Sequence, residues 1–174
     1  MNKIILILGG ARSGKSAQAL SLAKGKKKVA FIATGQGLDK EMRERILKHQ
    51  ASRPKNWKTF EEPKELADLM TKIGDSFDCI IIDCLTLLVS NLILSGKSQE
   101  QILKKIEDLV VVLKKKKAKV ILVSNEVGLG IVPDNKLGRA FRDIAGRVNQ
   151  TIAKEAGEVY FTISGLPLKI KGEK

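Results

Sequence analysis

Eight consecutive residues near the start of the chain have the types and spacing that bind phosphate groups. Gly9 and Gly14 permit a tight backbone path on which successive N–H groups converge on an anion. The ammonium group of Lys15 can reach the outer phosphates of a nucleotide and act in catalysis, and the hydroxyl of Ser16 can ligate Mg²⁺. The run reads Gly9, Gly10, Ala11, Arg12, Ser13, Gly14, Lys15 and Ser16. It predicts nucleotide binding and suits phosphoryl transfer.

A second metal ligand is expected at the end of another buried strand. Asp83 closes the apolar run Cys79–Asp83, and a carboxylate in that position can hold Mg²⁺ together with Ser16. The alternative is that Asp83 only caps the helix that follows, and it can do both.

The only histidine of the chain, His49, lies on a partly apolar helical pattern near Ile46. A structural role is the simpler interpretation of the residue taken alone. The functional alternative is a general base or covalent nucleophile. Arg45, Lys48 and Arg53 would lower the imidazole pKa if they lie close, and they can also steer a triphosphate or form a solvated helix face.

The elements that must position these groups alternate along the chain between short apolar runs and longer amphipathic ones. This alternation predicts βαβ units and a mostly parallel sheet. Strands are expected at 3–8, 28–33, Lys58–Glu61, Cys79–Asp83, 120–124 and Glu158–Ile163, with an edge at 167–170. Helices are expected at 15–24, 39–52 with Asp39 as its cap, after Pro63, at Leu85–Leu94 as a buried helix or oligomer contact, after a Ser98/Gln101 capping box, and at 135–155.

The length of 174 residues fits one domain. The pattern predicts an α/β protein, a P-loop NTPase-like three-layer sandwich with a mostly parallel central sheet, over residues 1–174. The net charge of +13 favours anionic partners, but its lysine clusters at 24–28 and 114–117 lack the interleaved aromatic residues of single-strand binding surfaces. We therefore expect a solvated surface and no nucleic-acid partner.

The two cysteines, Cys79 and Cys84, lie five residues apart on an expected strand, so their side chains should point to opposite faces. A disulfide is therefore not expected, and the pair fits a reducing compartment. The apolar run at 4–8 is too short for a signal peptide or a membrane span. These features predict a soluble, cytoplasmic protein.

Several further segments give the chain a resemblance to the bifunctional adenosylcobinamide kinase / adenosylcobinamide-phosphate guanylyltransferase family of cobalamin biosynthesis. The glycine-rich run alone would not be specific, whereas its combination with the histidine segment and the loop at 124–133 is. The segments are 9–16, 33–35, 49–54, 57–63, 83–86, 90–92 and 124–133, followed by Arg139, 141–143, Gly146, Asn149 and Gln150.

This resemblance implies two reactions. A nucleoside triphosphate, ATP or GTP, phosphorylates adenosylcobinamide, and GTP then transfers GMP to adenosylcobinamide phosphate through a GMP-histidine intermediate on His49. The resemblance also implies a homotrimer with sites between subunits. The implied nucleotide contacts are 9–16, Thr34, Gly35, Gln36, Gln50, Ala51, Ser52, Arg53, Glu61 and Asp83. Guanine offers N1–H and N2–H donors, so we expect the Glu61 carboxylate to accept from them. The alternative is a surface carboxylate at the end of a strand.

The sequence allows more than one role for several other residues, and more than one functional hypothesis. Glu126 and Asp143 lie in family-like segments, and one of them can accept the proton of the substrate hydroxyl. Asp134 and Asn135 can help to shape the opening of the corrinoid-binding site. The competing readings are a P-loop kinase without nucleotidyl transfer, a nucleic-acid-stimulated ATPase suggested only by the charge, and a nucleotide-responsive regulatory module.

Overall fold

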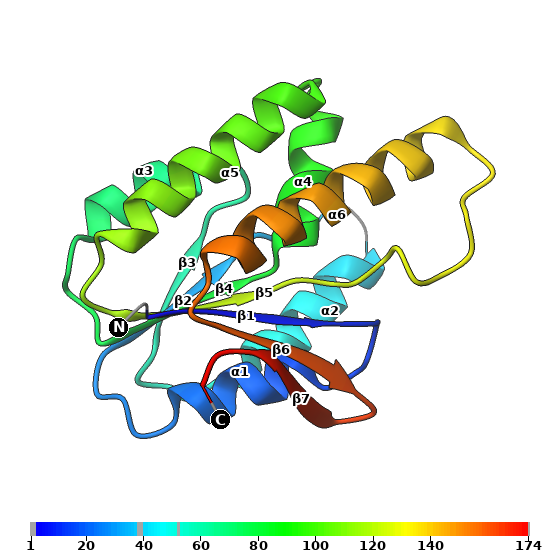
Figure 1. The fold of residues 1–174 in the computed structure, drawn as a ribbon. Coiled ribbons are helices and arrows are strands. Elements are labelled where there is room, and N and C mark those ends of the chain that lie inside the picture. Colours follow the sequence, from blue (N-terminus) through cyan, green and yellow to red (C-terminus); the bar gives the residue numbers. More distant parts are fainter. Residues whose placement is uncertain (1–2, 38–39, 52, 174) are drawn as a thin grey trace.

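The fold is built on one seven-stranded sheet with the strand order β3-β2-β4-β5-β1-β6-β7 (Figure 1). The computed structural model describes residues 3–37, 40–51 and 53–173. The strands are β1 Ile4–Gly9, β2 Val29–Ala33, β3 Lys58–Glu61, β4 Cys79–Asp83, β5 Lys119–Val123, β6 Glu158–Ile163 and β7 Leu166–Lys171. The helices are α1 Lys15–Ala23, α2 Lys40–Ala51, α3 Leu66–Ile73, α4 Leu85–Leu94, α5 Gln99–Lys114 and α6 Lys136–Glu155.

The sheet is parallel except for its last strand. Each pairing from β3 to β6 is parallel, and β7 returns antiparallel to β6. Strand β5 lies between β4 and β1, with Val123 beside both Asp83 and Ile7. The carboxyl ends of β1, β4 and β5 therefore meet at one edge, which brings the phosphate-binding run and Asp83 together.

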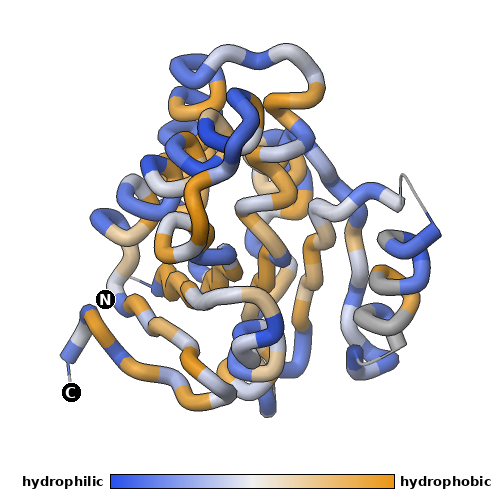
Figure 2. The backbone as a smooth tube through the Cα atoms, turned by 90° about the vertical axis from the view of Figure 1, so that its right-hand side faces the viewer, coloured by the Kyte–Doolittle hydropathy of each residue, from blue (hydrophilic) through white to orange (hydrophobic). Residues whose placement is uncertain are grey.

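The strands are buried on both faces, so their side chains divide into two aliphatic cores. Helices α3 to α6 cover one face, where Leu6, Ile80 and Leu122 are fully buried. Helix α1 covers the other face over Ile7, Ile81 and Ile121, and α2 lies on the same side of the sheet (Figure 1). In Figure 2 the hydrophobic stretches of the backbone, drawn in orange, run through the middle of the molecule. The predicted three-layer α/β class with a mostly parallel sheet is confirmed.

Side chains explain where the helices begin. The predicted capping box is present at α5, where Ser98 Oγ accepts from the Gln101 amide and Gln101 Oε1 accepts from the Ser98 amide. Asn135 caps α6 by accepting from Gly138 N at 2.7 Å. The expected Asp39 cap of α2 lies outside the described residues.

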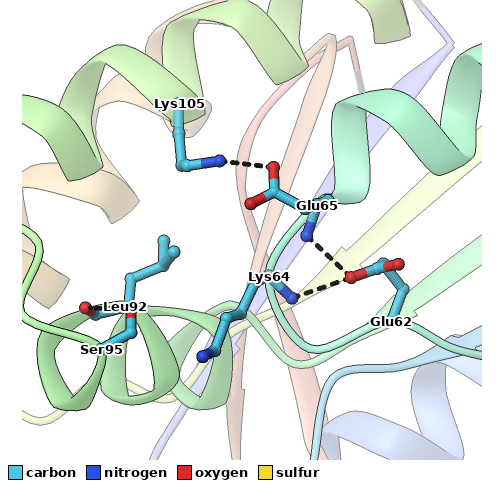
Figure 3. A network of polar contacts seen from close by, with 6 residues as sticks. All are labelled: Glu62, Lys64, Glu65, Leu92, Ser95 and Lys105. Atoms are coloured by element: carbon cyan, nitrogen blue, oxygen red, sulfur yellow. Dashed lines mark hydrogen bonds and ion pairs between the residues drawn. The ribbon is translucent and has the colours of Figure 1, made fainter.

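Helix α3 begins at Leu66, three residues beyond the Pro63 that was expected to open it. The Glu62 carboxylate captures the backbone amides of Lys64 and Glu65 at 3.1 and 2.8 Å, which holds this segment in a turn (Figure 3). Glu65 also pairs with Lys105 at 2.5 Å and so joins the start of α3 to α5.

The prediction for the two cysteines is correct in one respect and wrong in another. Both thiols are free and buried. They do not point to opposite faces, because β4 ends at Asp83 and Cys84 is the residue before α4, outside the alternation of the strand. Cys79 and Cys84 therefore pack in the same core.

Helix α4 is the buried helix that the sequence offered as one of two readings. Its residues Leu85, Leu88, Val89 and Leu92 are almost completely buried within the chain. Within the described ranges, no helix is both long enough and apolar enough to cross a membrane.

Candidate nucleotide and phosphoryl-transfer site

The phosphate-binding loop connects β1 to α1, and its glycines are required by close backbone approaches. Gly9 has a φ of +151°, and a Cβ there would lie 2.4 Å from the carbonyl oxygen of Thr162. Gly14 has a φ of +98°, and its Cβ would lie 3.0 Å from the Cα of Gly165. The N-terminal end of α1 follows directly, so its free N–H groups add to the anion site.

The turn between β6 and β7 supports this loop from behind. The Gly165 amide donates to the carbonyl of Ser13 at 2.9 Å. Lys15 is only 7% exposed, and its Nζ donates to the Gly10 carbonyl at 2.5 Å and to Ser13 Oγ at 3.4 Å. The ammonium group is thus held at the mouth of the loop by the loop itself.

Ser16 and Asp83 form the candidate metal pair. Ser16 Oγ lies 3.4 Å from Asp83 Oδ2. Two oxygen ligands at neighbouring positions of an octahedral Mg²⁺ site are separated by about 3 Å, so this pair fits the ion. The described part of the chain has no cluster of three or more His, Cys, Asp or Glu residues that could hold a metal. The fit is therefore to an ion held mainly by substrate phosphates and by these two side chains.

A cavity of about 410 Å³ extends from the loop toward α2. The loop and Asp83 give the cavity polar lining, and Ile46 of α2 and Leu87 of α4 add apolar side chains. Its lining residues are Arg12, Ser13, Gly14, Lys15, Ser16, Ala17, Ala33, Gly35, Ile46, Arg53, Asp83, Cys84, Leu87, Val123 and Asn125. The volume is that of a small-molecule site.

Arg53 adds a cation to the lining of this cavity, beside Arg12 and Lys15 of the phosphate loop. Its guanidinium lies 3.7 Å from the centre of the Phe31 ring, and its Nη1 lies 3.5 Å from Thr59 Oγ1. Burial lowers the pKa of Arg53, and the nearby Asp83 and Glu61 carboxylates oppose that shift. The guanidinium still stays charged at neutral pH. Its Nε is buried and has no hydrogen-bond partner among the described residues, which leaves a donor for an anionic ligand.

Glu61 ends β3 beside this arginine. It accepts a hydrogen bond from Gln50 Nε2 at 3.3 Å, so α2 and β3 meet through this pair. Gly35 lies against both α4 and α2, since a Cβ there would lie 3.3 Å from Leu87 and 3.8 Å from Ile46.

Thr34 does not line the cavity, but its hydroxyl and its carbonyl hold the neighbouring segments together. Its hydroxyl donates to the Cys84 carbonyl at 2.7 Å and accepts from the Cys84 amide at 2.8 Å. Asn91 Nδ2 donates to the carbonyls of Thr34 and Pro63 at 2.7 and 3.1 Å. These bonds join the ends of β2, β3 and β4 to α4.

Asn125 lines the cavity, although it is not among the site residues predicted from the sequence. It follows β5, between Asp83 and the loop. Its Nδ2 donates to Thr86 Oγ1 at 2.9 Å, and Asn149 Nδ2 donates to its carbonyl at 3.2 Å. The available signal was a polar residue directly after the buried strand 120–124.

The structure brings part of the predicted site set together in this cavity, namely Arg12, Ser13, Gly14, Lys15, Ser16, Gly35, Arg53 and Asp83. The other predicted site residues that the structure describes do not line this cavity. They are Gly9, Gly10, Ala11, Thr34, Gln36, Gln50 and Glu61. Ser52 lies outside the described residues, as do the side chains of His49 and Ala51, which belong to the last turn of α2.

The fold and the loop define a P-loop nucleotide-binding protein. Two solved structures share the architecture. The RadB recombinase aligns with a TM-score of 0.54 and 16% identity over 92% of this chain and 74% of its own. An ATPase of the type III secretion system of pathogenic bacteria aligns with a TM-score of 0.55 and 11% identity over 95% of this chain and 56% of its own. At these identities the likeness shows the fold alone.

The particular family is given by sequence. The model of the cobinamide kinase / cobinamide phosphate guanyltransferase family matches residues 5–170. The bifunctional adenosylcobalamin biosynthesis protein CobU of Salmonella typhimurium is 44% identical over 97% of this chain and 99% of its own length. CobP of Pseudomonas aeruginosa, which carries the same description, is 45% identical over 97% of both chains. The chain belongs to this family of transferase enzymes, and the resemblance seen in the sequence is confirmed.

Proposed function

We propose that the protein phosphorylates adenosylcobinamide with a nucleoside triphosphate and then transfers GMP from GTP to adenosylcobinamide phosphate, giving adenosylcobinamide-GDP and pyrophosphate. One observation carries the proposal. A single cavity joins the phosphate loop, the Ser16–Asp83 pair and Arg53, and it extends to the helix that bears the only histidine. The family match supplies the acceptor class.

The first reaction uses the loop side of the cavity. The loop amides and the Lys15 ammonium hold the outer phosphates, while Asn125 and Asp83 stand at the ends of the two neighbouring strands. Mg²⁺ bound by Ser16 and Asp83 would neutralise the charge that develops on the leaving diphosphate. The acceptor hydroxyl then displaces the nucleoside diphosphate from the γ-phosphorus. ATP and GTP both present the phosphates that this cradle binds.

The second reaction uses His49. It follows Ile46 by three residues in α2, and this spacing puts two helix positions on the same side. Ile46 lines the cavity, so this side of α2 faces the nucleotide site. We propose His49, which the family resemblance implies, as the nucleophile for the α-phosphorus of GTP. A nitrogen–phosphorus bond forms as pyrophosphate leaves, and the phosphate of the acceptor later breaks that bond. Arg53 offers its unpaired Nε to the phosphates.

Glu61 is proposed as the guanine-reading acceptor. A carboxylate can accept from both N1–H and N2–H of guanine, and Glu61 ends the strand next to Arg53 and Gln50. We further propose that the enzyme is a cytoplasmic homotrimer, in keeping with its family. Ile131 and Val132, exposed by 95% and 59%, are available for contacts between copies.

The test is covalent labelling. Purified protein and Mg²⁺ are incubated with GTP labelled at the α-phosphate, denatured and mapped by peptide, with His49→Ala and Lys48→Ala run in parallel. The expected result is acid-labile, alkali-stable GMP on the His49 peptide in the wild type and in Lys48→Ala, absent in His49→Ala, and discharged by adenosylcobinamide phosphate. An unlabelled wild type that still binds GTP would leave a kinase without nucleotidyl transfer.

A further inference from the structure

A second cavity, of about 330 Å³, adjoins the other side of the phosphate loop. The first half of the loop contributes to the lining, and the segment after β5 and the end of β6 contribute the rest. It is lined by Gly10, Ala11, Arg12, Ser13, Glu126, Leu129, Phe161, Thr162, Ile163 and Ser164. Arg12 and Ser13 line both cavities, so the two spaces meet at the loop.

Two polar groups make this cavity more than an apolar hollow. Thr162 is 1% exposed, and its hydroxyl has no hydrogen-bond partner among the described residues. Such a buried, unpaired hydroxyl is costly, and a bound ligand that pairs with it removes the cost. The second group is the Glu126 carboxylate, whose Oε1 accepts from the Gly128 amide at 2.7 Å.

Glu126 is fixed against the start of the phosphate loop. Its backbone amide donates to the Gly9 carbonyl at 2.9 Å, directly before the loop residues that line the cavity. Asp143 is the other carboxylate that the sequence offers as acceptor of the hydroxyl proton. It lies on α6, its side chain is 63% exposed, and its Oδ1 lies 3.7 Å from Arg142 Nε. It lines neither cavity.

The rim of the cavity is apolar. Leu129 is 80% exposed and Ile163 is 53% exposed, and the half-buried Phe161 also lines the cavity. A rim of this kind can receive the apolar face of a large ring system, while a narrow hydroxyl-bearing arm enters between Glu126 and Thr162.

We infer that this second cavity receives the acceptor alcohol of the kinase reaction, a hydroxyl-bearing side arm of a large corrinoid ring, and that Glu126 is its general base. The inference rests on the proposed function. A donor nucleotide in the first cavity and an acceptor in the second then meet across Arg12 and Ser13.

The step balances as follows. The Glu126 carboxylate takes the hydroxyl proton, and the alcohol oxygen forms a bond to the γ-phosphorus. The bond from that phosphorus to the β–γ bridging oxygen breaks, and the nucleoside diphosphate leaves with its electron pair. The second reaction needs no such base, because its acceptor is an ionised phosphate. Glu126 therefore serves only the first reaction.

The first test separates the two reactions in one variant. Glu126→Gln should lower kcat for the phosphorylation of adenosylcobinamide by at least about 100-fold, the usual size of a general-base contribution. The KM for ATP and the transfer of GMP to preformed adenosylcobinamide phosphate should stay within about 2-fold of wild type. Asp143→Asn is the matched carboxylate control and should change neither reaction. Equal loss of both reactions in Glu126→Gln overturns the role of Glu126.

The second test measures binding at the rim and at the unpaired hydroxyl. Adenosylcobinamide is titrated calorimetrically into protein saturated with a non-hydrolysable ATP analogue. Ile163→Gln should weaken binding several-fold, whereas Val111→Gln should not, since Val111 is also 53% exposed but lies on α5. Thr162→Val keeps the shape of the side chain and should weaken binding by about 2- to 10-fold, the size of one neutral hydrogen bond.

The outcomes are distinct. If the wild type binds and phosphorylates adenosylcobinamide and none of the cavity variants changes either property, the second cavity is not the acceptor site and the proposed function stands. If the wild type binds ATP but neither binds nor phosphorylates adenosylcobinamide, the proposed function fails and this inference fails with it.

Discussion

Two adjacent glycines of the phosphate loop, Gly9 and Gly10, differ in whether the structure has room for a side chain at their position. A Cβ at Gly9 would lie 2.4 Å from the Thr162 carbonyl at a φ of +151°, whereas a Cβ at Gly10 would meet nothing within 4 Å. We predict that Gly9→Ala lowers the free energy of unfolding by about 2–4 kcal/mol, because both backbone strain and a steric clash oppose it. Gly10→Ala should change it by less than about 1 kcal/mol. Urea denaturation of both variants measures the difference, and equal effects would contradict this account of the loop.

Asp83 and Asp78 offer a comparison of two carboxylates beside the same strand. Asp83 is the last residue of β4 and lies at the nucleotide site, with Oδ2 3.4 Å from Ser16 Oγ. Asp78 precedes the other end of β4, where its carboxylate accepts from the backbone amide of Lys28. Asp83→Asn should reduce the Mg²⁺-dependent kinase rate by at least about 100-fold, because an amide is a weaker ligand for a hard cation. Asp78→Asn should leave the Mg²⁺ dependence unchanged. Rates measured over a Mg²⁺ titration, with nucleotide binding in EDTA as a folding control, decide the matter; wild-type Mg²⁺ dependence in Asp83→Asn would remove Asp83 from the metal site.

At the scale of single elements, the buried thiol at the start of β4 gives the protein a pH-dependent stability. Burial raises the pKa of Cys79 from 9.0 to about 11. A thiol with a raised folded-state pKa holds its proton more tightly in the folded state. Its stabilising contribution is therefore complete below pH 9 and is lost as the pH rises from 9 to 11. Two pKa units correspond to a limit of about 3 kcal/mol.

The measurement is urea denaturation at pH 8 and at pH 10.5 under reducing conditions. The wild type should lose about 2 kcal/mol more unfolding free energy between these pH values than Cys79→Ala does. The variant controls for Lys and Tyr residues, which titrate in both proteins. Parallel losses in the two proteins would show that Cys79 does not contribute.

Helix α4 joins the strand ends through Asn91. Its Nδ2 pairs with the carbonyls of Thr34 and Pro63, and its side chain is 94% buried with only 6% exposed. Asn91→Leu should cost about 2–3 kcal/mol of stability, because it leaves two buried carbonyls without their donor. It should also raise the KM for GTP, since the segments after β2 and β3 carry Gly35 and Glu61. Ser95 Oγ donates to the Leu92 carbonyl of its own helix at 2.8 Å, so Ser95→Ala, the control, should cost less than about 1 kcal/mol.

The elements could be predicted from the sequence wherever the controlling interaction is local. The strands at 3–8 and Cys79–Asp83 follow from continuous apolar runs, and the Ser98 cap follows from a four-residue pattern. The start of α3 could not be read in this way, because Pro63 suits the first turn of a helix in general. The Glu62 carboxylate satisfies the amides of the next residues instead, and only the folded backbone reveals that competition.

The candidate site divides in the same way. The loop and Asp83 could be placed from a motif and a strand end. Asn125, Thr162 and Gly165 could not, because their relation to the loop depends on the strand order that puts β5 and β6 on either side of β1. The missed residues are thus those whose sequence separation from the loop exceeds 100 positions, as in the contact of Gly165 with Ser13.

At the scale of the whole molecule, two clusters of lysine residues lie away from the nucleotide site. The lysine clusters at 24–28 and 114–117 connect helices to the starting ends of β2 and β5. Backbone bonds from Asp78 N to the Lys28 carbonyl and from Lys119 N to the Asp78 carbonyl place these starting ends side by side. The phosphate loop lies at the other ends of the strands (Figure 1). A basic edge therefore opposes the site across the length of the sheet.

This separation predicts that polyanion binding and catalysis are independent. A variant with Lys26, Lys27 and Lys115 all changed to Gln should elute from heparin at lower salt than the wild type, because fewer counterions are exchanged. Its KM values for nucleotides should remain unchanged, since screening over this distance is nearly complete at physiological ionic strength. Duplex or single-stranded nucleic acid should not stimulate nucleotide hydrolysis by either protein. Stimulation that disappears in the variant would instead favour a nucleic-acid-dependent ATPase and would give the basic edge a role in turnover.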